Sequence, residues 1–260
     1  QRDFQNSTES SLEASIAFVE DDIVSFMEEL SWLSEGTAVR NFAQHVVTTT
    51  SFNFNSPEYL DIQAGMMRLF EDTLARNADK AASIIFLAND GRAYGEVSFD
   101  EEGQLQVIGG VRGTLMLGDE TFSNALTIAE PNIPYLSRVS LAEDGTGESV
   151  VTAYIPVSSR GDQNNALGAI QVVLRLNSVE QILNDALSHP LIEQEQRRLV
   201  LVDRSNQIIV DTETGQDTAL TDEVFSKDGD YIQNRVGNLA ISSEEVFGLE
   251  GLGTPWHLLL

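Results

Sequence analysis

Apolar residues near the N-terminus recur at alternating steps of four and three positions. The series comprises Leu12, Ile16, Val19, Ile23, Phe26, Leu30 and Leu33. This heptad spacing keeps one apolar seam along a helix, and acidic residues fill the other faces. Val39, Phe42 and Val46 continue the pattern after a phase shift near Gly36. The pattern therefore predicts a long N-terminal helix over residues 1–50.

A second helix is predicted to begin at Ser56 and Pro57. A serine hydroxyl can cap a helix N-terminus, and proline suits the first helical position because its fixed φ is helical and its missing N–H is not needed there. Apolar residues at helical spacing follow, from Tyr59 to Leu74, and the helix should end near Arg76 and Asn77.

Beyond residue 80 the apolar pattern changes from helical to strand-like, with turns rich in Asn, Asp and Gly such as residues 89–91. Strands are expected at 82–88, 92–99, 104–108, 135–141, 149–157 and 166–176. Residues 121–129 form a short amphipathic segment, and residues 178–187 a helix. Further strands are expected at 199–203, 207–211, 231–241, 244–247 and 254–260.

The strand-turn-strand unit occurs twice, because residues 84–92 resemble residues 199–207. A helix precedes each copy. The predicted fold class is therefore α+β: a long N-terminal helix followed by two modules, each an antiparallel sheet flanked by helices.

The order of these segments resembles the double Cache family, the tandem PAS-like sensor domains of chemoreceptors, sensor histidine kinases and cyclic-dinucleotide enzymes. Residues 85–91 resemble its opening strand and turn, and residues 135–141 its mid-domain strand. Residues 154–157 with 167–172 resemble its paired central strands, and residues 256–259 its closing strand. The resemblance covers nearly the whole chain. It implies three parts: the N-terminal helix (1–50), a membrane-distal module (51–187) and a smaller membrane-proximal module (188–260).

The same resemblance implies an extracytoplasmic receptor domain that binds a small molecule in the distal module and passes the signal to flanking transmembrane helices. The chain begins at Gln1 and stops in mid-pattern at Leu260, which suggests a piece of a longer membrane protein. Amino-acid-sensing members carry an Arg followed closely by a Trp. Here Arg112 is followed by Gly-Thr-Leu-Met, and Trp32 and Trp256 lie elsewhere, so no amino-acid ligand is expected.

Six polar or aromatic residues lie on segments that line the pocket in proteins of this type. The candidate ligand-binding residues are Tyr94, Arg112, Phe122, Tyr135, Arg138 and Tyr154. A guanidinium facing an aromatic-walled cavity would hold a carboxylate, since its fork matches two oxygens; the expected ligand is thus an organic acid. The alternative is that each Tyr packs on a strand face and each Arg pairs with a surface Glu.

Composition narrows the function classes. There are 15 Lys and Arg against 41 Asp and Glu, a formal net charge of -26, and no cysteine. Such a charge repels nucleic acid, and the missing thiols exclude disulfides and cysteine nucleophiles. No Gly-x-Ser-x-Gly motif and no paired histidines occur. We therefore expect neither an enzyme nor a cofactor or metal site, although the oxygen-rich turns at residues 100–102 and 162–164 leave calcium open as an alternative.

The heptad seam has two interpretations: it packs on its own domain, or it pairs with a second copy in a parallel homodimer, which the spacing favours. A second function class also stays open. The chain would then be a protein-interaction or spacer module of a receptor, with no small ligand of its own.

Overall fold

The computed structural model describes only part of the chain. The described residues are 17, 21, 25–49, 53–100, 102–113, 118–127, 134–137, 140–141, 149–159, 162–187, 200–202, 208–211, 234–236, 239–241, 243–245 and 257–259. The chain divides into two compact units, one of residues 26–175 and the other of residues 1–25 with 176–260.

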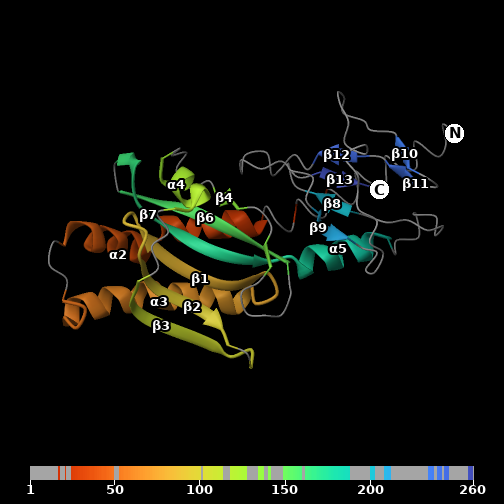
Figure 1. The fold of residues 1–260 in the computed structure, drawn as a ribbon. Helices are drawn as coiled ribbons and strands as arrows, with labels where there is room; N and C mark the ends of the chain where they lie inside the picture. The colour runs from red at the N-terminus through yellow and green to blue at the C-terminus, as the bar shows by residue number, and fades with distance from the viewer. Residues whose placement is uncertain are drawn as a thin grey trace. The chain divides into compact units, whose positions relative to one another are not determined.

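The 26–175 unit is built on one antiparallel sheet, ordered β3-β2-β1-β7-β6-β4, in which β5 also pairs with β6 (Figure 1). Its strands are β1 (Ala81–Ala88), β2 (Ala93–Phe99), β3 (Leu105–Arg112), β4 (Tyr135–Leu136), β5 (Ser140–Leu141), β6 (Ser149–Ser159) and β7 (Asp162–Arg175). The long central strands β1, β6 and β7 carry apolar residues on both faces, as strands covered on both sides require.

Two helices, α2 (Thr37–Thr48) and α3 (Pro57–Arg76), pack on one face of this sheet. The Phe42 ring of α2 meets the Phe86 ring of β1 edge to face, with the centroids 5.4 Å apart. The start of α3 confirms the prediction: the Ser56 hydroxyl accepts a hydrogen bond from the Tyr59 N–H (3.2 Å), and Pro57 is the first helical residue. The unit thus runs across residue 50, because helices on both sides of that position cover the same sheet.

The described part of the expected N-terminal helix is in two pieces. Residues 25–35 are helical, Gly36 has extended backbone angles (φ -54°, ψ 131°), and α2 begins at Thr37. Glycine suits the break, since a Cβ at this position would lie only 3.0 Å from the Leu33 carbonyl oxygen. The earlier seam positions, from Leu12 to Ile23, lie outside the described residues.

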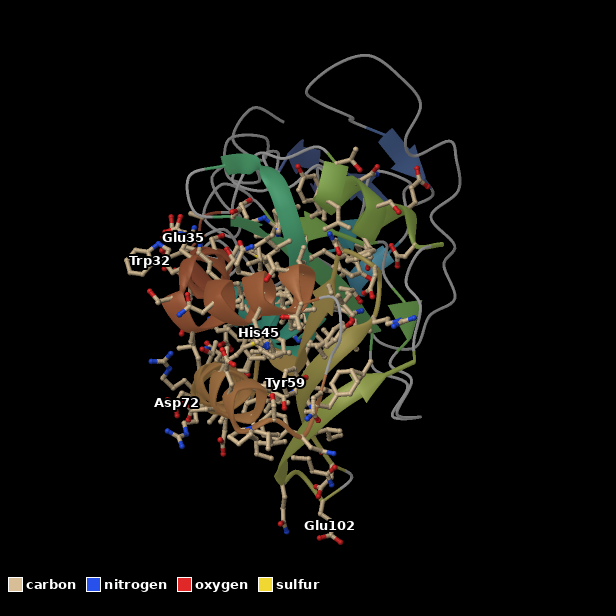
Figure 2. All side chains as sticks on the ribbon, turned by 90° about the vertical axis from the view of Figure 1, so that its left-hand side faces the viewer. Trp32, Glu35, His45, Tyr59, Asp72 and Glu102 are labelled. Atoms are coloured by element: carbon tan, nitrogen blue, oxygen red, sulfur yellow. The ribbon has the colours of Figure 1, made fainter. Side chains whose placement is uncertain are left out.

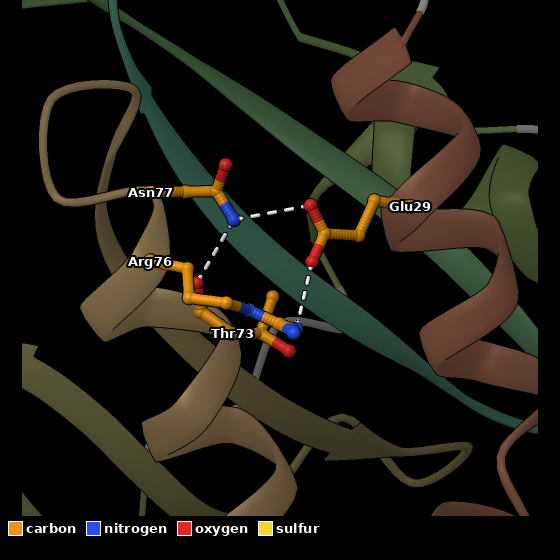
Figure 3. Close-up of polar contacts among 4 residues, drawn as sticks. All are labelled: Glu29, Thr73, Arg76 and Asn77. Carbon is orange, nitrogen blue, oxygen red and sulfur yellow. Dashed lines mark hydrogen bonds and ion pairs between the residues drawn. The ribbon is translucent and has the colours of Figure 1, made fainter.

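The helix over residues 25–35 is fastened to the end of α3 (Figure 3). The Glu29 carboxylate accepts from Arg76 (2.9 Å) and from the Asn77 side-chain amide (3.2 Å), which also donates to the Thr73 carbonyl. On the inner side Phe26, Leu30 and Leu33 are buried. The described part of the heptad seam therefore packs within its own unit.

The other unit contains α5 (Asn177–Leu187) and two small antiparallel sheets. Four strands follow the order β12-β13-β8-β9, and β10 pairs with β11. The bounds are β8 (Val200–Val202), β9 (Ile208–Asp211), β10 (Asn234–Val236), β11 (Leu239–Ile241), β12 (Ser243–Glu245) and β13 (His257–Leu259). The single strand expected over residues 231–241 is wrong, because β10 and β11 both lie within this range and pair with each other antiparallel, with Val236 opposite Leu239.

Candidate functional site

A cluster of apolar side chains lies on the face of the sheet opposite α2 and α3, under helix α4 (Glu120–Thr127). The face is fixed by alternation along β1, where Phe86 meets α2 and its neighbour Leu87 belongs to the cluster. The buried members are Leu87, Ala93, Phe122, Ala125, Tyr154 and Ala169, with Ile85, Leu126 and Tyr135 packed against them. We call this group the α4 cluster.

Three polar side chains are joined by hydrogen bonds at the edge of the α4 cluster. Asp119 caps α4, because its Oδ1 accepts from the Phe122 N–H at 2.8 Å. Its Oδ2 accepts from the Tyr154 hydroxyl at 3.0 Å. The Gln171 side-chain amide of β7 donates to the same hydroxyl at 3.3 Å. One carboxylate therefore links the start of α4 to the centre of the sheet.

The Tyr154 hydroxyl remains a donor to Asp119 over the physiological pH range. Burial of the ring raises the pKa of Tyr154 well above its ordinary value, and the adjacent Asp119 carboxylate raises it further. Both causes disfavour the phenolate. The arrangement places a carboxylate, a neutral phenol and an amide beside a buried aromatic cluster.

The structure brings three of the six predicted site residues together. The rings of Phe122 and Tyr154 lie 5.8 Å apart, and Tyr135 is the direct partner of Tyr154 in the β4–β6 pair. Arg112 is paired with Ala93, a member of the α4 cluster, but its side chain lies outside the described part. Arg138 also lies outside the described residues.

Tyr94, by contrast, lies on the other face of the sheet. Its ring contacts the Phe42 ring of α2 edge to face, with centroids 6.5 Å apart, and its hydroxyl donates to Asp90 (3.5 Å). Burial raises the pKa of Tyr94, with Asp90 as the next cause. This residue is separated from the α4 cluster by the sheet itself.

Sequence reasoning missed Asp119 and Gln171. A signal existed for both. Asp119 lies two positions before the amphipathic segment over residues 121–129, near where a cap is expected, and Gln171 is the one polar residue within the apolar run from Leu167 to Leu174. Neither signal says that the two side chains meet on Tyr154, since that contact depends on the sheet pairing.

The Asp100 carboxylate of the acidic turn is already hydrogen-bonded within its own hairpin. The Asp100 carboxylate accepts from the backbone N–H groups of Glu102 (3.0 Å) and Gln104 (2.7 Å) and from the Gln106 side chain (3.1 Å). These bonds, that of Gln104 first, lower the pKa of Asp100. Within the described residues no group of three or more metal-ligating side chains occurs. The helices of the described part also include none with the length and apolar content needed to cross a membrane.

Comparison with known proteins gives structural neighbours only. No family model and no curated protein matches the chain. The extracellular domain of the histidine kinase vpHK1S-Z8 superposes with a TM-score of 0.65 at 13% identity, covering 98% of this chain and 94% of that one. The ligand-binding domain of the Pseudomonas aeruginosa PAO1 amino acid chemoreceptor PctC, in complex with GABA, gives 0.57 at 16% identity, with 99% of each chain covered.

A third neighbour is the ligand-binding domain of the Campylobacter jejuni chemoreceptor Tlp3 in complex with L-valine. It gives a TM-score of 0.56 at 10% identity and covers 98% of this chain and 94% of its own. At such identities the agreement concerns the fold, and it extends over almost the entire length of each pair. The chain has the α+β fold of the extracellular sensor domains of chemoreceptors and histidine kinases.

Proposed function

We propose that this chain is the extracytoplasmic small-molecule-sensing part of a transmembrane signalling receptor. The observation that carries the proposal is the α4 cluster with Asp119, Tyr154 and Gln171 at its edge. A few convergent polar groups beside apolar and aromatic side chains are typical of ligand sites. The solved neighbours support it, because two of them are ligand-binding domains in complex with a small molecule.

In this proposal residues 51–187 form the membrane-distal module, which contains most of the 26–175 unit, and residues 188–260 form the membrane-proximal one. The ligand binds in the distal module beside α4. The signal then passes to the transmembrane helices of the receptor. No catalytic step is assigned to the domain.

The ligand is an organic acid in this proposal. Arg112 and Arg138 are the residues we assign to its carboxylate, because an arginine fork matches two oxygens. The backbone register supports position 112, since residues directly opposite in an antiparallel pair share a face and Ala93 is in the α4 cluster.

A thermal-shift screen of small organic acids tests this function. A ligand present at a hundred times its Kd should stabilise the native domain by about 2.7 kcal/mol and raise its melting temperature. Arg112→Ala should abolish that response. Arg92→Ala is the matched control, because Arg92 is exposed at the β1–β2 turn and pairs with Asp90 (3.7 Å).

The same screen separates the alternatives. A response to amines or amino acids that survives Arg112→Ala would refute the organic-acid assignment and keep the sensor. If no compound in the library raises the melting temperature and the immobilised domain retains periplasmic proteins, an interaction module without a small ligand is favoured.

We also propose a homodimer through the N-terminal helix, on a different face from the seam. Phe26, Leu30 and Leu33 are already buried within their own unit, whereas Trp32 is 77% exposed on the same helix. Its ring projects from the molecule beside Glu35 (Figure 2). A large exposed aromatic residue is a strong anchor when a second copy covers it.

Trp32→Ala should therefore weaken self-association by about tenfold or more, as truncating an anchor residue does. Sedimentation velocity over a concentration series measures the effect. Added salt should strengthen the wild-type dimer, because it screens the exposed acids on this helix. Leu60→Ala, a 50% exposed apolar residue on α3, is the control; equal behaviour of the two variants would contradict the proposed face.

A further inference from the structure

Strand β2 contains an extra residue opposite β1. Ile85 pairs with Glu96 and Leu87 pairs with Ala93, so Phe86 alone faces both Tyr94 and Gly95. One residue opposed by two is a β-bulge, which bends the strand and re-aims its side chains.

A second bulge adjoins the first, on β3. Ala93 pairs with Arg112 and Gly95 with Gly109, so Tyr94 faces two residues, Gly110 and Val111. Gly110 has a φ of +94°, a conformation that glycine adopts without steric cost. The two bulges meet at Tyr94.

The bulges decide which face each side chain occupies. In an undistorted strand Tyr94 would share a face with Glu96 and lie opposite Leu87, inside the α4 cluster. Because β2 is bulged, Ala93 takes that place and Tyr94 turns toward Phe42 of α2.

A buried side chain of α3 holds the point where the bulges meet. Gln63 is 6% exposed, and its amide donates to the Tyr94 carbonyl at 2.7 Å and to the Tyr59 hydroxyl at 3.0 Å. Glycines let α3 come this close. A Cβ at Gly95 would lie 2.6 Å from the Met67 sulfur, and one at Gly109 would lie 3.4 Å from Gln63 Oε1.

We propose that Gln63 is a positioning residue for the candidate ligand site on the opposite face of the sheet. By binding the Tyr94 carbonyl it fixes the double bulge, and the bulge sets Ala93, rather than Tyr94, on the face of the α4 cluster. The inference rests on the proposed function only in calling that cluster a ligand site. The control of register stands on the contacts alone.

NMR on Gln63→Met tests the proposal without any ligand. Methionine has a similar length and no donor. We expect the cross-relaxation contact between the Tyr94 and Phe42 rings to disappear, and the amides of Gly95 and residues 109–112 to exchange about tenfold faster than the rest of the sheet. Tyr59→Phe, which removes only the second acceptor of Gln63, should keep the ring contact. Thr73→Val changes an equally buried polar residue on α3 and should also keep it.

The proposal is overturned if Gln63→Met keeps the contact between the Tyr94 and Phe42 rings and raises amide hydrogen exchange evenly over the sheet, as Thr73→Val does. If Gln63→Met does not fold, Gln63→Asn, whose shorter amide cannot reach both partners, is scored in the same way. Lost ring contact together with an unresponsive wild-type ligand screen would keep Gln63 as the register residue and remove the sensor function instead.

Discussion

Replacing Gly168 with alanine should lower the free energy of unfolding of the 26–175 unit by about 3 kcal/mol or more, the upper range for overpacking a core. Gly168 lies in β7, paired with Ala88 on one side and Val157 on the other. A Cβ there would collide with the Leu87 carbonyl oxygen and lie 3.0 Å from the Ala88 Cα. These atoms are backbone at the centre of a sheet, so they cannot move aside without breaking ladder hydrogen bonds.

Urea unfolding followed through the amide signals of β7 measures this effect. Gly113→Ala is the control, because a Cβ at Gly113 meets nothing within 4 Å; its cost should stay within about 0.5 kcal/mol. If Gly168→Ala costs no more stability than Gly113→Ala, the close approach of β7 and β1 is wrong. The part of the sheet on which the α4 cluster packs would then be wrong as well.

Local rules were sufficient for most elements of the 26–175 unit. Ser56 and Pro57 place the start of α3 to the residue, because capping depends only on neighbouring positions. Alternating apolar runs separated by Asn, Asp and Gly place β1, β2, β6 and β7 within a few residues. The expected strand over residues 135–141 is split into β4 and β5, both paired with β6.

Distant contacts explain what the sequence did not reveal. Tyr94 was expected in the site because its segment lines the pocket in proteins of the family that the sequence resembles. The sequence did not reveal the bulge that turns Tyr94 away, at which the Tyr94 carbonyl accepts from Gln63, 31 positions earlier. The spacing of Phe26, Leu30 and Leu33 predicts an apolar seam but not whether the cover is the same domain or a second copy. For these three residues the cover is the same domain.

The candidate site shows the same division. Phe122, Tyr135 and Tyr154 were predicted from their segments, and the structure does bring them together. Asp119 lies 35 positions before Tyr154 and was not predicted, since only the pairing of β6 beneath α4 makes the two side chains neighbours. The capping role of Asp119 can be predicted from the sequence, whereas its hydrogen bond to Tyr154 depends on the fold.

Replacing Phe122 with alanine should cost about 3–5 kcal/mol of stability, the range for emptying a buried aromatic site. Phe122 is 1% exposed, and its ring meets that of Tyr154 at a tilt of 58°. It is the largest apolar group that α4 contributes to the α4 cluster. We expect α4 to separate from the sheet before the sheet itself unfolds. Hydrogen exchange of residues 120–127 should then approach that of an exposed helix, while β7 remains protected.

Two milder variants distinguish packing from the polar link. Tyr154→Phe keeps the ring and loses the hydrogen bonds to Asp119 and Gln171, so it should cost about 1 kcal/mol and leave α4 protected. Asp119→Asn should behave similarly, because asparagine also caps helices. If Phe122→Ala leaves the exchange of α4 unchanged, the aromatic contact does not hold this helix. The other outcome is that Phe122→Ala exposes α4 to exchange and abolishes a thermal response to an organic acid, while Tyr154→Phe retains that response. In that case the Phe122 ring is part of the ligand site, and α4 is the element that the ligand orders.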